Sequence, residues 1–218
     1  MITVSKILDV EKYLEDVDVV LFDLDDTLYS EKEYVRSGFD AIAAEYPKVL
    51  CMGNKLWQAF LNGLPAIDTV LESEKLLMEK EKCLHIYRFH TPNIHFYPGV
   101  RSMIEHIKEI KRVGLITDGR PEGQRAKISA LGLDLLMDKI IITDELGGIQ
   151  YRKPSLESFI LMKEFFNVEY EHMVYIGDNI KKDFIAPEEL GIKTIYFSNP
   201  DSVALYSSKQ LFIKKIET

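Results

Sequence analysis

The sequence predicts an α/β fold in which a parallel sheet carries helices on both faces and a helical region is inserted after the first strand. Two observations lead to this prediction. Short apolar runs of strand length alternate with segments of helical period, as in a parallel sheet. About ninety residues separate the first run from the second, far more than one crossover helix with short connections needs.

The composition is that of a globular protein with an acidic surface. The 218 residues include 27 Lys and Arg against 35 Asp and Glu, which gives a net charge of −8. This balance repels polyanions and anionic lipid, so we expect no nucleic-acid or membrane partner. Two cysteines are too few for a disulfide framework, and we see no signal peptide and no apolar run of membrane-spanning length. We therefore expect a cytoplasmic protein.

Five apolar runs have the length of buried strands, and turn residues or helical segments bound them. We take them as successive strands of the predicted sheet. The predicted strands are Val17–Leu24, Val113–Thr117, Lys139–Thr143, Met173–Ile176 and Ile192–Phe197.

The region between the first two strands is predicted to be helical. A first amphipathic stretch runs from Val35 to Tyr46 and stops at Pro47, and a second runs from Leu76 to Tyr87. The region shows no strand-like alternation. Its length and pattern predict a helical insertion rather than a crossover connection.

Proline and glycine delimit the helices that follow the insertion. After Pro98-Gly99, apolar residues at helical spacing predict a helix from Val100 to Ile110. Pro121 in the first turn and Gly132 at the end mark the next helix, since these residues favour opposite helix ends. Pro154 is likewise predicted in the first turn of a later helix.

Three carboxylates, Asp23, Asp25 and Asp26, lie at the carboxyl end of the first predicted strand, where open α/β sheets bind ligands. Like charges this close repel and raise one another's pKa, so such a cluster is typical of a cation site. A solvated acidic turn or a helix cap is the alternative interpretation.

Other predicted strands also end in reactive side chains. Thr117-Asp118-Gly119 follows the second strand, Asp178 follows the fourth, and Asp183 comes five residues later. Parallel strands present their carboxyl ends at one edge, so these groups are expected to meet Asp23 there. Lys153 lies between the third and fourth predicted strands. Alone it would be read as a solvated surface charge, and it becomes a candidate site residue only together with the groups at the strand ends.

The ordered set of these residues resembles the haloacid dehalogenase superfamily. Its four motifs match Asp23-Leu24-Asp25-Asp26-Thr27, Thr117, Lys153 and Gly177-Asp178-Asn179-Ile180-Lys181-Lys182-Asp183. The resemblance implies a Rossmann-like core of residues 1–29 and 97–218 and an all-helical cap of residues 30–96, inserted as in subfamily I phosphatases.

The resemblance also implies a set of catalytic roles. Asp23 would attack a phosphoryl group and form an aspartyl-phosphate intermediate. Asp25 would protonate the leaving alkoxide and then deprotonate the attacking water, and one proton on Asp25 would neutralise the empty site. Lys153 would bridge the nucleophile and the phosphate. Mg²⁺ would be held by an Asp23 oxygen, the Asp25 backbone carbonyl and Asp178.

The remaining implied roles concern the substrate and the second shell of the metal. Asp183 would orient the ligands from behind. Thr117, the Gly119 amide and the start of the next helix would bind phosphate oxygens. Asp118 stands where this family more often has Asn, which leaves its part in aligning the substrate open. Arg120 is a candidate for a substrate anion or hydroxyl.

The expected function is hydrolysis of a small phosphorylated metabolite by a monomer or homodimer. A phosphomutase shares the phosphoenzyme and stays open as an alternative, as does a non-enzymatic phospho-acceptor or binding protein. Haloacid dehalogenation is disfavoured because Asp25 is present, since dehalogenases typically lack this second Asp.

Overall fold

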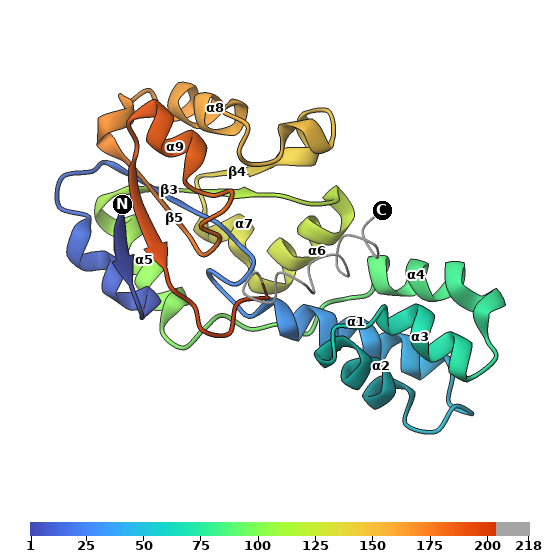
Figure 1. Cartoon of the computed structure of the whole chain (residues 1–218). Helices are drawn as coiled ribbons and strands as arrows, with labels where there is room; N and C mark the ends of the chain where they lie inside the picture. The colour runs from blue at the N-terminus through green and yellow to red at the C-terminus, as the bar shows by residue number, and fades with distance from the viewer. Residues whose placement is uncertain (204–218) are drawn as a thin grey trace.

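The computed structural model describes residues 1–203 of the chain. Within them, six parallel strands form one sheet in the order β1-β6-β5-β2-β3-β4 (Figure 1). The prediction of an α/β fold with a Rossmann-like parallel sheet is confirmed. The strands are β1 (Ile2–Val4), β2 (Val19–Phe22), β3 (Arg112–Thr117), β4 (Lys139–Ile142), β5 (Met173–Gly177) and β6 (Lys193–Phe197).

Strand β1 was not among the predicted strands. It has three residues and pairs with β6 at one edge of the sheet, with Val4 opposite Phe197. Three residues are too few to show an alternating pattern, so no strand period could be detected there. A 3-10 helix, η1 (Ile7–Tyr13), follows it.

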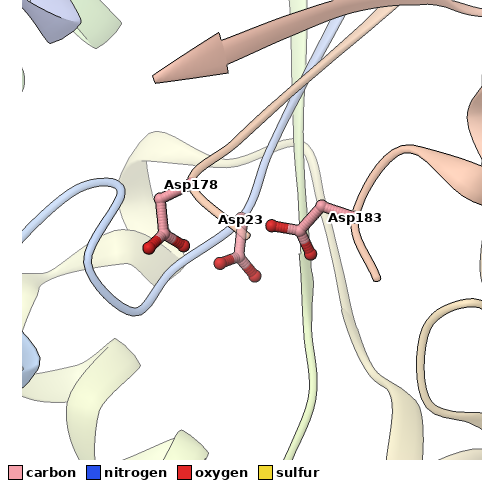
Figure 2. Close-up of side chains that lie close together, drawn as sticks. All are labelled: Asp23, Asp178 and Asp183. Carbon is pink, nitrogen blue, oxygen red and sulfur yellow. The ribbon is translucent and has the colours of Figure 1, made fainter. Parts of the chain in front are cut away.

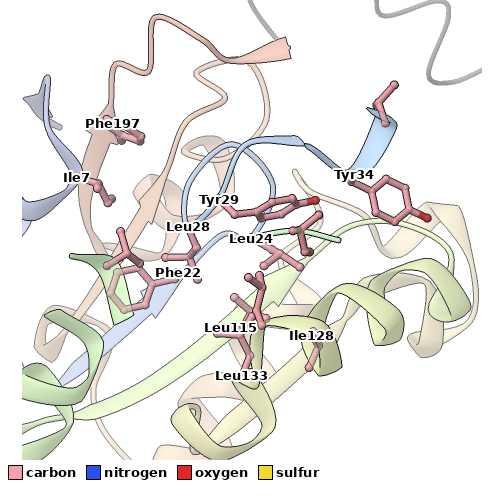
Figure 3. Close-up of a cluster of buried hydrophobic side chains, with 14 of the residues drawn as sticks. Ile7, Phe22, Leu24, Leu28, Tyr29, Tyr34, Leu115, Ile128, Leu133 and Phe197 are labelled. Atoms are coloured by element: carbon pink, nitrogen blue, oxygen red, sulfur yellow. The ribbon is translucent and has the colours of Figure 1, made fainter. Parts of the chain in front are cut away.

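The two faces of the sheet are buried by different helices. In β2, Val20 and Phe22 belong to one hydrophobic cluster, and Val19 and Leu21 belong to the other. Figure 3 shows the first cluster around Phe22, whose full burial contributes about 1.5–3 kcal/mol. The helices α5 (Val100–Ile110), α6 (Pro121–Leu131) and α7 (Leu133–Leu136) contribute to the first cluster, and α8 (Glu157–Phe166) and α9 (Ile185–Leu190) to the second.

The predictions for the helix ends have mixed outcomes. Helix α5 has the predicted bounds. Helix α6 begins at Pro121 and ends at Leu131, and the predicted Gly132 follows it with a left-handed φ of 68°. The prediction for Pro154 is wrong. Helix α8 begins at Glu157, and Pro154 lies before it in a cis peptide bond with Lys153.

Four α-helices fill the insertion between residues 30 and 96: α1 (Glu31–Glu45), α2 (Met52–Leu61), α3 (Ala66–Ser73) and α4 (Lys80–Phe89). The two predicted amphipathic stretches correspond to α1 and α4, whereas α2 and α3 were not predicted individually. Helix α1 packs against α2 and α4, and α3 packs against α2 and α4. Among residues 1–203, no helix combines the length and apolar composition needed to cross a membrane.

The insertion leaves and rejoins the core at one place. The Tyr97 N–H donates to the Leu28 carbonyl at 2.9 Å, and Tyr29 pairs with Phe96 in an antiparallel bridge. Helix α4 packs against α6 of the core. Figure 1 shows α1–α4 as a group beside the sheet, on the side where α6 lies. The helical insertion is therefore seated on the core through α6 and these two connecting segments.

Candidate active site

The carboxyl ends of β2, β3 and β5 lie side by side. Phe22, the last residue of β2, is in register with Leu115 of β3 and Ile176 of β5. The Asp23 N–H donates to the Ile176 carbonyl at 2.8 Å. Residues that follow these strands, including Asp178, therefore meet at one edge of the sheet.

Lys153 holds Asp23 in the interior. Its side chain is fully buried, and its ammonium donates to Asp23 Oδ1 and, at 2.7 Å, to the Tyr175 hydroxyl. Asp183 Oδ1 lies 2.9 Å from the same nitrogen. Removing a lone ammonium from water costs several kcal/mol, so these carboxylates offset the burial of Lys153.

Asp23, Asp178 and Asp183 form a compact buried cluster. One oxygen from each lies within 4.8 Å of the others, and Figure 2 shows Asp23 between the other two. Burial raises the pKa of Asp23 to about 7, with Lys153 opposing the rise. Burial, reinforced by the charges of Asp183 and Asp23, also raises the pKa of Asp178. The cluster thus holds more negative charge than its protein neighbours compensate.

Asp183 lies beside Asp23 and Asp178 as a member of this cluster, and its role in orienting the metal ligands stays a prediction. Its Oδ2 accepts a hydrogen bond from the Asn179 N–H at 2.9 Å. Its Oδ1 is buried and faces the Lys153 ammonium, which lies 2.9 Å away. A Cβ at Gly177 would lie 2.5 Å from Asp183 Oδ2, so the close approach needs glycine there.

The Asp25 side chain lies outside this cluster. Tyr29 Oη and Lys127 Nζ both donate to its Oδ1, the lysine at 2.8 Å, and Gln124 Nε2 donates to Oδ2 at 3.1 Å. Burial raises the pKa of Asp25, but the charge and hydrogen bond of Lys127 outweigh burial and lower it. The sequence led us to expect a proton here, because it did not reveal Lys127.

Asp118 is occupied by protein donors. Its Oδ1 accepts from the Thr143 hydroxyl at 3.0 Å and from the Lys153 N–H at 3.1 Å, and its Oδ2 accepts from Lys182 Nζ at 2.9 Å. Burial raises its pKa, but Lys182 and Lys153 together lower it to about 2. Both oxygens of Asp118 therefore accept hydrogen bonds from the protein. One of these hydrogen bonds holds the backbone N–H of Lys153 in place.

The other predicted substrate residues lie beside Asp118. Thr117 is buried at the end of β3, and Arg120 is half-buried at the residue that precedes α6. Gly119 has a φ of +136°, and a Cβ there would lie 2.7 Å from Gln124 Nε2. The segment therefore needs glycine, and the substrate-binding roles of these residues stay predictions.

Asp26 anchors the start of the helical insertion. It is buried with a left-handed φ of 55°. Its Oδ1 accepts from the Glu31 N–H at 2.9 Å and its Oδ2 from the Val203 N–H at 2.6 Å. The Ser202 hydroxyl donates to Asp178 in turn. The carboxylate thus ties α1 and the segment after β6 to the site.

Sequence reasoning missed two lysines that contact the site. Lys182 stood within the fourth motif without an assigned role. Lys127 and Gln124 occupy positions of the buried stripe of α6, which continues with Ile128 and Leu131. Two polar residues on an otherwise apolar stripe were the signal that could have revealed them.

A family comparison agrees with this geometry. The family model described as "Haloacid dehalogenase-like hydrolase" matches residues 20–197, from β2 through β6. The chain belongs to this family. The prediction of a hydrolase of the haloacid dehalogenase superfamily is therefore confirmed.

Relatives of this hydrolase include named phosphatases. A glyceraldehyde 3-phosphate phosphatase of Pyrococcus abyssi is 33% identical over 101 residues, which cover 46% of this chain and 41% of that protein. The enzyme of the same name from Methanocaldococcus jannaschii is 29% identical over 191 residues, covering 81% of this chain and 82% of that one. The first match thus spans less than half the length of the relative.

Solved structures share the fold of the hydrolase. A subfamily IA haloacid dehalogenase-superfamily hydrolase from Geobacter sulfurreducens superimposes with a TM-score of 0.66 at 16% identity, covering 85% of this chain and 89% of that one. At this identity the likeness supports the fold alone.

Proposed function

We propose that this hydrolase is a Mg²⁺-dependent phosphatase of a small phosphate monoester and acts through an aspartyl-phosphate on Asp23. The observation that carries the proposal is the environment of Asp23. Its carboxylate is buried at the sheet edge, paired with Lys153, and clustered with Asp178 and Asp183. Its similarity to phosphatases of glyceraldehyde 3-phosphate favours the same chemistry.

The residues present fit a magnesium ion. Hard carboxylate and carbonyl oxygens are its preferred ligands. Asp23, Asp178 and the Asp25 carbonyl would hold it, with Asp183 oriented beside them. When bound, the ion would supply positive charge that stabilises the phosphoryl oxygens. With all side chains ionised, five carboxylates face three ammonium groups, so these residues carry an excess of two negative charges, which one divalent cation balances. The carboxylates are those of Asp23, Asp25, Asp118, Asp178 and Asp183, and the ammonium groups are those of Lys127, Lys153 and Lys182.

The chain's own residues would perform two chemical steps. An Asp23 oxygen attacks phosphorus while the bond to the ester oxygen breaks and that oxygen takes a proton from Asp25. Asp25 then removes a proton from water, which attacks the aspartyl-phosphate and releases inorganic phosphate. A bound phosphate dianion favours the protonated form of Asp25 in the first step, whereas pairing with Lys127 favours the ionised form needed in the second.

The proposed cap of residues 30–96 would limit access to the site and recognise the substrate beyond its phosphate. The core would comprise residues 1–29 and 97–218, of which residues 204–218 lie outside the described part of the chain. Thr117, Gly119 and Arg120 would bind the phosphate and its neighbours. We further propose a small phosphorylated metabolite as substrate, no nucleic-acid or membrane partner, a cytoplasmic location and a monomeric or homodimeric state.

A phosphate-release screen tests the proposal. Sugar phosphates, nucleoside monophosphates and phosphoglycolate are each assayed with Mg²⁺ and with chelator, for the wild type and for Asp23→Asn. We expect metal-dependent release from at least one ester and none from the variant. Metal-dependent turnover that survives in Asp23→Asn would refute the nucleophile, and phosphoryl transfer to a second hydroxyl without phosphate release would indicate a mutase.

A further inference from the structure

Lys127 is a buried lysine outside the four family motifs. It lies on α6, where its side chain is 4% exposed. Burying an ammonium costs several kcal/mol unless partners compensate it. A hydrophobic residue would fill this position in the stripe of α6 at no such cost. The lysine therefore has a role that its charge and its contacts must explain.

Its first contact is the carboxylate of Asp25. Lys127 Nζ and Tyr29 Oη both donate to Oδ1, whereas Gln124 Nε2 donates to Oδ2 at the longer distance of 3.1 Å. Two donors on one oxygen fix the rotation of the carboxylate about its last bond. Oδ1 is thereby the anchored oxygen, and Oδ2 is the oxygen that remains for proton transfer.

The second contact of Lys127 lies in the helical insertion. Its Nζ is 4.3 Å from the ring centroid of Tyr34, which is within the range of a cation–π interaction. Tyr34 is buried on α1, and its ring meets the edge of Tyr87 of α4 at 5.8 Å. The ammonium thus lies between the Asp25 carboxylate and an aromatic cluster of the insertion. Figure 3 shows Tyr34 and Tyr29 with Ile128, the residue that follows Lys127.

We propose that Lys127 is a positioning residue that turns Asp25 Oδ2 toward the ester oxygen of the substrate, and that Tyr34 makes this orientation depend on the packing of the insertion against α6. The inference rests on the proposed phosphatase function. It goes beyond that function because it assigns different roles to the two Asp25 oxygens. It also makes the orientation of Asp25 depend on how the helical insertion packs against α6.

Two aryl esters test the proposal. 4-Nitrophenyl phosphate has a leaving group that departs without a proton, whereas phenyl phosphate depends on the proton that Asp25 supplies. We expect Lys127→Met to lower kcat/KM, which reports phosphoryl transfer to Asp23 and not the later hydrolysis shared by both esters, about 100-fold for phenyl phosphate and less than about 10-fold for 4-nitrophenyl phosphate. We expect Tyr34→Leu to give the same selectivity with a smaller loss.

Arg125→Met is the matched control, because Arg125 lies on the same helix but pairs with Glu145 on the surface. It should leave both rates unchanged. Equal losses on the two esters in Lys127→Met, or no loss on either, would overturn the proposal, because a general defect of folding or binding affects both alike.

A second measurement separates this inference from the proposed function. Urea unfolding of Lys127→Met, Asp25→Asn and the double variant reports the coupling of the two side chains without any turnover. We expect the double variant to lose less stability than the sum of the single variants. Additive losses contradict the positioning role, whereas a wild type that hydrolyses no ester while the coupling persists refutes the phosphatase and leaves the Lys127–Asp25 anchor standing.

Discussion

The pair of Asp118 and Lys182 gives a quantitative prediction. In Asp118→Asn, the Oδ1 position still accepts from the Thr143 hydroxyl and the Lys153 N–H. The amide nitrogen then takes the place of Oδ2 and faces the Lys182 ammonium, which lies 2.9 Å from that atom. Two donors thus meet where an ion pair stood. We expect stability to fall while the backbone position of Lys153 is kept.

The size of the loss follows from the pKa of Asp118. A carboxyl whose pKa falls from 3.8 to about 2 is stabilised in its ionised form by about 2 kcal/mol. The Asp118 side chain is 8% exposed, but that of Lys182 is 35% exposed, so solvent screens part of the attraction. We therefore expect Asp118→Asn to cost between about 1 and about 2 kcal/mol at pH 7. That loss lowers Tm by roughly 2 to 8 °C for a chain of this size.

The pH dependence has a definite sign. Because the pKa of Asp118 is lowered by folding, its contribution is complete well above 3.8 and disappears as the pH falls through about 2. The difference in stability between wild type and Asp118→Asn should therefore be largest at neutral pH and fall to about half near pH 3. Urea unfolding at a series of pH values measures this difference.

A double-mutant cycle with Lys182→Met completes the test. If the ion pair accounts for the loss, the double variant should recover most of it, with a coupling of about 1 to 2 kcal/mol. Losses that add to within about 0.5 kcal/mol, or a difference that does not change between pH 7 and pH 3, would refute the reasoning. Turnover of Asp118→Asn should stay within a few-fold of the wild type, since Lys153 keeps its anchor.

Three further predictions concern the metal cluster and the glycines around it. Mg²⁺ at about 100 times its Kd should stabilise the wild type by about 2.7 kcal/mol, and the shift in Tm should largely disappear in Asp178→Asn; an equal shift in both proteins would exclude Asp178 as a ligand. Gly177→Ala places a Cβ 2.5 Å from Asp183 Oδ2, so we expect weaker Mg²⁺ binding by calorimetry, and wild-type affinity would contradict this. Gly119→Ala adds strain at a φ of +136° and a Cβ 2.7 Å from Gln124 Nε2. We expect a stability loss of about 1–3 kcal/mol with slower phosphate release, and unchanged unfolding would show that the loop adapts.

The sequence located the ends of five strands to within two residues, because each strand is a short apolar run followed by a polar residue. Once β2, β3 and β5 are parallel neighbours, Asp23, Thr117 and Asp178 must lie at the same edge, whatever the chain does between them. This part of the site follows from topology. The three-residue strand β1 and the two helices α2 and α3 carry too little periodicity to be assigned in the same way.

The partners of these residues do not follow from topology. Lys127 contacts a carboxylate 102 positions away, and Lys182 contacts one 64 positions away. From the sequence alone each lysine is indistinguishable from a solvated surface charge. Its burial depends on the rotation of its helix and on segments that are distant in the sequence, and the local pattern reveals neither. The same reason hid the partner of Asp118: the sequence did not reveal that Lys182 donates to one of its oxygens, and its role toward the substrate stays a prediction.

The lysines also bear on how the site relates stability to catalysis. Lys127, Lys153 and Lys182 each neutralise a different aspartate, and each comes from a different element. Such pairs seldom stabilise a fold on balance, because desolvation offsets much of their attraction. These pairs instead hold side chains and backbone in place. Lys127 orients the Asp25 carboxylate, and Asp118, paired with Lys182, holds the backbone N–H of Lys153. The negative charge that they leave uncompensated lies at Asp23, Asp178 and Asp183, and this excess is the reason we propose that the divalent cation binds there.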